Sequence, residues 1–175
     1  MYSVANDRSL SRLISVAVLE RLWRPCTMRL RFDKGTSLMP NENELELNAT
    51  ATAQLIVGPE DLASSLPIET GDAFPQVLAT ARMVALMEIA ASRVLKPLLG
   101  PGELSVGVIV DVTHSAPTPP GVQVTATARY AGREGKLFLF EVSASDPGGE
   151  IGRGWHKRAI VTSERLQGAA ARRLA

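Results

Sequence analysis

Residues 77–98 read VLATARMVALMEIAASRVLKPL, and apolar side chains recur through them at the spacing of one face of an α-helix. The expected apolar face comprises Val77, Ala81, Val84, Ala85, Ala91, Val94, Leu95 and Leu98. Pro97 and the turn at residues 100–102 end the pattern, because proline lacks the amide proton that a continuing helix needs and glycine readily adopts turn conformations. We therefore predict one long central helix.

Strand patterns lie on both sides of this helix. Before it, apolar and polar residues alternate over residues 45–55, which is typical of a half-buried strand, and a turn leads into a short helix at residues 62–66. After it, four strands are predicted at residues 104–113, 122–130, 137–145 and 151–162. The turn-rich connections between them are short, which favours antiparallel neighbours.

This order of elements predicts an α+β protein with a hotdog fold, in which an antiparallel β-sheet wraps around one long central α-helix. A single wrapped helix would leave apolar surface and a sheet edge exposed, so we expect a homodimer or a higher oligomer. The domain is expected to span residues 32–166, followed by a frayed tail at residues 167–175. Residues 1–31 are expected to lie outside it, as a disordered segment, a loosely attached helix or an upstream start with Met28 as the natural one.

Composition excludes several classes of function. Nineteen Lys and Arg against eighteen Asp and Glu leave a net charge of +1, which predicts neither nucleic-acid nor membrane-surface binding. The apolar run at residues 13–19 is too short to span a membrane. One cysteine, Cys26, permits no internal disulfide, which fits the cytoplasm, and two histidines argue against a zinc site.

Three residues stand out as candidates for chemistry, each with a structural alternative. Glu88 interrupts the apolar helix, where a carboxylate is exposed, paired or functional. His114 closes the stripe Val106, Val108, Val110 and Val112, and an imidazole facing a carboxylate can act as a general base. Thr80 lies at the helix entrance, where threonine commonly caps the backbone. His156, which is followed by the basic residues Lys157 and Arg158, is interpreted as a solvated or phosphate-facing strand position.

Thr80 and Glu88 are eight positions apart, which is roughly 12 Å along a helix, so they cannot hydrogen-bond directly. Two arrangements remain open. Either His114 lies between them, or the set is completed across a dimer interface, with helix residues of one subunit facing strand residues of the other. We favour the second arrangement.

Several blocks in the same order resemble the fluoroacetyl-CoA thioesterase-like family. They are Phe74-Pro75-Gln76-Val77-Leu78-Ala79-Thr80, Val84-Ala85-Leu86-Met87-Glu88, Val112-Thr113-His114-Ser115-Ala116, Thr118-Pro119-Pro120-Gly121 and Gly152-Arg153-Gly154-Trp155-His156-Lys157-Arg158-Ala159. The similarity extends over residues 50–165 and is weakest before Phe74.

The resemblance implies a homodimeric hotdog acyl-CoA thioesterase that hydrolyses an acyl-CoA to the free acid and coenzyme A without a metal or other cofactor. It implies Thr80, Glu88 and His114 as the catalytic set, Gly107 and Arg158 as residues lining the acyl pocket, and Phe74 as part of a hydrophobic lid. A second lid phenylalanine of the family is replaced here by Gly71, which puts selectivity for fluoroacetate in doubt. Arg129, Arg153 and Lys157 are candidates for the phosphates of coenzyme A, or ordinary surface charges.

Two other functions fit the same fold. One is a hotdog acyl-CoA hydratase or dehydratase, which places its acid and base differently. The other is a non-catalytic acyl-CoA-binding domain of a regulator, with residues 1–31 contacting DNA, although so short a segment cannot form a complete helix-turn-helix.

Overall fold

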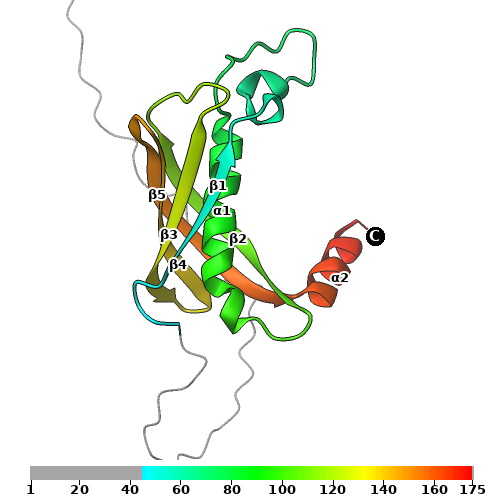
Figure 1. The fold of residues 1–175 in the computed structure, drawn as a ribbon. Helices are drawn as coiled ribbons and strands as arrows, with labels where there is room; N and C mark the ends of the chain where they lie inside the picture. Colours follow the sequence, from blue (N-terminus) through cyan, green and yellow to red (C-terminus); the bar gives the residue numbers. More distant parts are fainter. Residues whose placement is uncertain (1–44, 175) are drawn as a thin grey trace, which may run out of the picture. The chain divides into compact units, whose positions relative to one another are not determined.

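The computed structural model describes residues 45–174, and the elements named below belong to that part of the chain. In chain order they are β1 (Thr50–Ile56), η3 (Pro59–Asp61), η4 (Ala63–Ser65), α1 (Thr80–Leu95), η5 (Lys96–Leu98), β2 (Glu103–His114), β3 (Gln123–Glu134), β4 (Leu137–Asp146), β5 (Gly149–Thr162) and α2 (Ser163–Arg173). Figure 1 shows α1 lying across the strands. The first strand begins at Thr50 instead of residue 45, and two 3-10 turns replace the predicted short helix.

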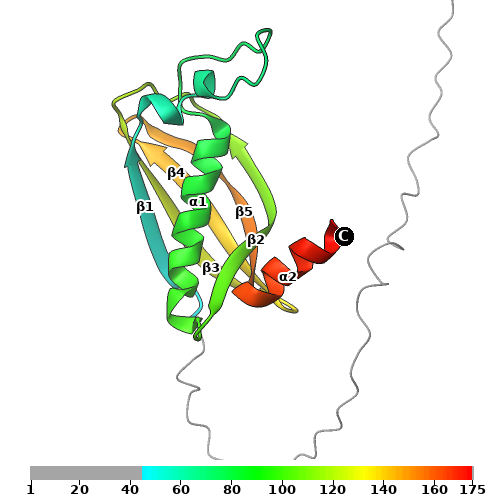
Figure 2. The ribbon, with the colours of Figure 1, turned by 90° about the vertical axis from the view of Figure 1, so that its right-hand side faces the viewer.

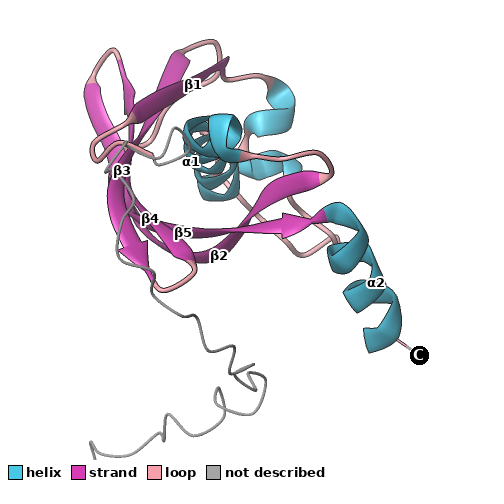
Figure 3. Cartoon of the chain, turned by 90° about the horizontal axis from the view of Figure 1, so that it is seen from below, coloured by secondary structure: helices cyan, strands magenta, loops and turns pink. Residues whose placement is uncertain are grey.

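The strands form one antiparallel sheet in the order β1-β3-β4-β5-β2. Consecutive strands β3, β4 and β5 pair through short turns, while β1 and β2 occupy the two edges. Figures 2 and 3 show this sheet curling around α1. The predicted hotdog arrangement is confirmed.

The core lies between α1 and the concave face of the sheet. The helix contributes the buried residues Met83, Leu86, Met87, Ala90, Ala91, Val94 and Leu95. The strands beneath it present the buried alanines Ala53, Ala126 and Ala128, whose small side chains let the helix approach closely. The predicted apolar face is right in its second half and wrong in its first, where Ala81 is exposed. In this first half, apolar residues lie on two sides of the helix. The side that carries the larger, flexible side chains of Met83 and Met87 packs into the core.

Strand β2 contains a bulge, because its register against β5 shifts between Gly107 and Ile109. Val108 is the extra residue, and it is 51% exposed. Side chains on one face of a regular strand recur every second residue, but the extra residue reverses that alternation. Gly107 before the bulge and His114 after it therefore both face α1. The predicted single stripe from Val106 to His114 does not exist, since the bulge divides it between the two faces.

The chain continues beyond the sheet as α2, whose N-cap Thr162 accepts a hydrogen bond from the amide of Arg165. The tail predicted to fray from residue 167 is thus helical as far as Arg173. The predicted extension at residues 1–31, with Cys26, lies outside the described residues. Among residues 45–174, no helix is long and apolar enough to cross a membrane.

Candidate active site

Thr80 and His114 meet at one end of the helix. Thr80 is the first residue of α1 and His114 the last residue of β2, and the Oγ1 of Thr80 lies 2.9 Å from the Nδ1 of His114. The N-cap of α1 is Ala79, without a side-chain capping bond, so the capping alternative for Thr80 is wrong. The threonine hydroxyl is instead within hydrogen-bonding distance of an imidazole.

A pocket of about 360 Å³ opens beside this pair, lined by Ala63, Phe74, Pro75, Val77, Leu78, Thr80, His114, Ser115, Ala116 and Pro117. Phe74, one of the lining residues, is half exposed. The Nε2 atom of His114 is buried and has no hydrogen-bond partner among the described residues. A polar atom buried in this way is costly unless another group satisfies it.

Asp61 holds the start of α1 in place. Its carboxylate accepts from the amide of Gly58 at 2.9 Å and from the guanidinium of Arg82, and its carbonyl accepts from the amide of Ala79 at 2.8 Å. Burial raises the pKa of Asp61, but the Gly58 amide and Arg82 together outweigh burial, and the net pKa lies below its usual value. Asp61 is therefore a buried anion that ties the preceding loop to the first turn carrying Thr80.

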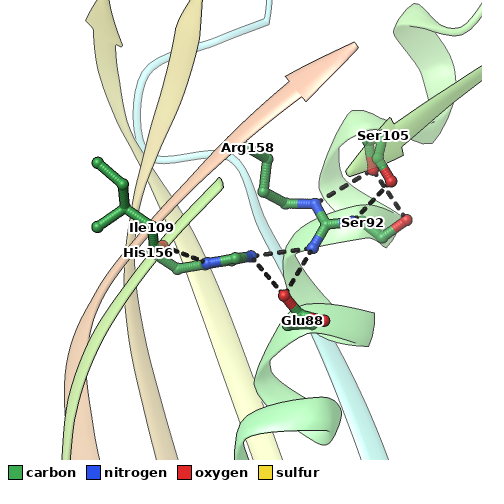
Figure 4. A network of polar contacts seen from close by, with 6 residues as sticks. All are labelled: Glu88, Ser92, Ser105, Ile109, His156 and Arg158. Carbon is green, nitrogen blue, oxygen red and sulfur yellow. Dashed lines mark hydrogen bonds and ion pairs between the residues drawn. The ribbon is translucent and has the colours of Figure 1, made fainter. Parts of the chain in front are cut away.

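Glu88 belongs to a different group of side chains, shown in Figure 4. Its Oε1 lies 3.8 Å from the Nη1 of Arg158 and 3.7 Å from the Nε2 of His156. Gly107 packs directly against it, because a Cβ at that position would overlap the carboxylate. Glu88, Gly107 and Arg158 thus come together, but none of the three is among the residues that line the pocket beside Thr80 and His114.

A polar network extends from Arg158 to β2 and, through β2, to α1 (Figure 4). Its Nε donates to the Oγ of Ser105 at 3.2 Å, and its Nη2 donates to the Ser105 carbonyl at 2.8 Å. The Ser105 hydroxyl donates in turn to Ser92 of α1 at 3.1 Å. Arg158 is only 5% exposed, so these contacts hold a cation inside the protein.

The interpretation of His156 as a solvated position is wrong, since it is 1% exposed. It lies two residues before Arg158 on β5, and side chains two residues apart share a face of the sheet. That spacing was the signal in the sequence that places His156 with Arg158. Ser92 and Ser105 gave no comparable signal.

The predicted site residues therefore form two groups within one chain. Thr80, His114 and Phe74 line the pocket, whereas Gly107 of β2 and Arg158 of β5 lie beside Glu88, which is further along α1. The expectation that helix and strand residues come from different subunits does not apply to Thr80 and His114, which meet within one chain.

The three candidate phosphate-binding cations are paired with carboxylates. Arg153 binds Glu150 through two contacts of 2.6 and 2.7 Å, Lys157 binds Glu134 at 2.5 Å, and Arg129 pairs with Glu141. Arg153 and Lys157 alternate along β5 with inward-facing residues, so they lie on the face away from α1. This favours ordinary surface charges. Within residues 45–174, no cluster of three potential metal ligands occurs.

A family model described as fluoroacetyl-CoA-specific thioesterase matches residues 57–164. The chain belongs to this thioesterase family. A fluoroacetyl-CoA thioesterase from Streptantibioticus cattleyicolor is 48% identical over 93 residues, which cover 53% of this chain and 67% of that relative.

Solved structures agree with the family assignment. A structure of the fluoroacetyl-CoA thioesterase superposes with a TM-score of 0.70 at 38% identity, covering 74% of this chain and 97% of the other. A thioesterase superfamily member from Thermus thermophilus superposes with a TM-score of 0.66 at 30% identity, covering 75% and 93%. As a member of the fluoroacetyl-CoA-specific thioesterase family, the chain is a thioester hydrolase with the hotdog fold.

Proposed function

We propose that the chain hydrolyses a short or otherwise small acyl-CoA to the free acid and coenzyme A, as a cytoplasmic homodimer that needs no cofactor. The observation that carries this proposal is the contact of 2.9 Å between Thr80 and His114 at the wall of a pocket. A hydroxyl paired with an imidazole is the arrangement that nucleophilic or general-base attack on a thioester requires.

The reaction follows from that pair. An oxygen atom, either of Thr80 or of a water molecule that it binds, attacks the thioester carbonyl while His114 accepts its proton. The carbon–sulfur bond then breaks, and the departing sulfur of coenzyme A takes up the proton from His114. The first amides of α1 have no acceptor within the helix, so they are placed to donate to the carbonyl oxygen as negative charge develops on it. Attack by Thr80 would require a second step in which water releases the acid.

The role proposed for Glu88 requires a second copy of the chain. Glu88 forms no ion pair or hydrogen bond with His114 in one subunit, and its side chain is 39% exposed. The edge strand β2 also leaves Val108, Ile109 and Val110 exposed by 51%, 46% and 43%. We infer that two copies pair antiparallel along β2 and cover these side chains.

Such pairing also joins the two groups of site residues. Gly107 and His114 lie on opposite sides of Asp111 in β2. In an antiparallel pairing centred near Asp111, His114 of one copy comes level with Gly107 of the other, and Glu88 packs against that glycine. The carboxylate of one subunit would then orient the imidazole of the other and satisfy its buried Nε2 atom.

Subunit complementation tests this arrangement. His114→Ala and Glu88→Ala should each abolish most release of coenzyme A while leaving the dimer folded. A heterodimer purified with one subunit of each variant should recover activity, because one of its two sites then receives both wild-type side chains. If Glu88 and His114 acted within one subunit, every site in the heterodimer would carry one substitution and the heterodimer would stay inactive.

The acyl group is the remaining part of the proposal. Gly71 stands where the resemblance places a lid phenylalanine, and a Cβ built there would meet no atom within 4 Å. We expect a more open lid and therefore weaker selection for fluoroacetyl-CoA. A panel of acyl-CoAs graded by chain length and halogenation tests this, with release of the thiol as the readout. A preference for fluoroacetyl-CoA over acetyl-CoA that Gly71→Phe leaves unchanged would contradict the inference about the lid.

A further inference from the structure

His156 has both ring nitrogens engaged in the protein interior. Its Nδ1 lies 2.9 Å from the carbonyl oxygen of Ile109, and its Nε2 lies 2.9 Å from the Nη1 of Arg158. A carbonyl can only accept, so Nδ1 carries a proton. A guanidinium can only donate, so Nε2 carries a lone pair. The ring is therefore a neutral imidazole in the Nδ1-protonated form.

The surroundings agree with a neutral ring. Burial lowers the pKa of His156, and the charge of Arg158 lowers it further, against the opposing effects of the Ile109 carbonyl and Glu88. In this form Nε2 cannot donate to Glu88, although the two atoms lie only 3.7 Å apart. Arg158 is consequently the link between the histidine and the carboxylate.

The three contacts of Arg158 divide its nitrogens between two partners. Ser105 accepts from Nε and Nη2, and His156 accepts from Nη1. Nη1 is also the nitrogen that faces Glu88, at 3.8 Å. His156 is thus the hydrogen-bond acceptor for this nitrogen, and its own orientation is set by the backbone of β2 just after the bulge.

We propose that His156 is a positioning residue for thioester hydrolysis, which acts through Arg158 to hold the Glu88 carboxylate in its working position. This inference rests on the proposed function. His156 is buried behind Arg158 and has no free ring nitrogen, so it takes no part in the proton transfers assigned to His114.

Two substitutions separate this role from a purely structural one. A glutamine side chain can place its amide oxygen where Nε2 lies, which keeps an acceptor for Arg158. An asparagine side chain can place its amide nitrogen where Nδ1 lies, which keeps the donor to Ile109. We expect His156→Gln to retain most of kcat and His156→Asn to lose roughly 10- to 100-fold, the effect of displacing a reacting group by about 1 Å. The reverse order, or wild-type activity in both variants, would overturn the proposal.

If both variants fold but are equally inactive, a second comparison decides whether His156 acts through Arg158. Should His156 act through Arg158, adding His156→Asn to an Arg158→Met enzyme causes no further loss of kcat. Multiplied losses would mean that His156 acts by another route, and the proposal would be wrong. Lys157→Gln, one residue away on the outer face and paired with Glu134, is the control variant and should keep wild-type kcat.

A spectroscopic measurement tests the inference even if the chain hydrolyses none of the thioesters tried. The chain contains two histidines, so a His114→Gln variant leaves His156 as the only imidazole. We expect its nitrogen NMR spectrum at neutral pH to show a protonated Nδ1 and an unprotonated Nε2. An Nε2-protonated ring or an imidazolium would exclude Arg158 as its donor and refute the proposal.

Discussion

Replacing Gly107 with alanine should disable the Glu88 group with little damage to the fold. An added Cβ would overlap the Oε1 of Glu88 and lie 3.3 Å from its Cδ and 3.1 Å from the Cε1 of His156. Carbon atoms in contact are ordinarily about 3.5–4.0 Å apart, so the carboxylate must move by roughly 1 Å. The backbone of Gly107 is not in the left-handed region, so alanine introduces no strain there.

The consequence for activity can be estimated from that displacement. A misplacement of about 1 Å at a reacting group costs up to about 100-fold in rate, so we expect kcat to fall by roughly 10- to 100-fold. Stability should fall by about 1–3 kcal/mol at most, because the half-exposed Glu88 side chain can rotate towards solvent. Thiol release measures the first quantity and urea denaturation the second.

A double variant tests whether the added methyl group acts through Glu88. In a Glu88→Ala background the overlapping carboxylate is absent, so Gly107→Ala should cause little additional loss of residual activity or stability. An equal loss in both backgrounds would contradict this prediction, because it would show that the alanine acts on something other than Glu88. Gly168→Ala in α2 is a control that adds a methyl group far from the site and should leave kcat unchanged.

Asp61→Asn should destabilise the protein by about 1–3 kcal/mol in urea denaturation, because the amide cannot replace the buried anion beside Arg82. Since folding lowers the pKa of Asp61, its ionised carboxylate should stabilise the protein above about pH 4, and this stabilisation should disappear as the pH falls through the folded pKa. An unchanged acid transition in the variant would contradict this. The lowered pKa of His156 predicts that stability falls below about pH 6.5 by at most about 1.4 kcal/mol per pH unit, and that His156→Gln removes this slope. Gly154→Ala should cost about 3 kcal/mol or more in thermal or urea unfolding, because its Cβ would lie 2.6 Å from the Cα of Val112; a stable variant would show that the β2–β5 pairing can shift.

The fold was predictable because each element has its own periodic signal. The helix over residues 77–98 and the four later strands were recognisable from spacing and turn residues, and their lengths left few topologies. The errors have one cause in common, which is that a local pattern does not say which side chains the rest of the protein covers. Ala81 and Met83 both continue an apolar pattern, and only packing against the sheet, where the Met83 side chain lies beside Gly152 of β5, selects the methionine.

For the candidate site, local patterns and the resemblance name individual residues but do not specify how those residues are arranged. The eight-residue separation of Thr80 and Glu88 correctly excluded their direct contact. The pairing of Thr80 with His114 depends on where β2 ends relative to the start of α1, which no local pattern specifies. The network around Arg158 depends on the bulge, and a single valine inserted into a valine-rich strand carries no visible mark of its own.

The bulge also constrains how this strand can change in length. Gly107 and His114 are separated by an odd number of positions, yet both face α1 because Val108 is an extra residue. Deleting or adding one residue between them would turn one of the two groups to the outer face of the sheet. Insertions and deletions among relatives should therefore gather in the turns at either end of β2, and an alignment gap between Gly107 and His114 would mark a protein whose site is built differently.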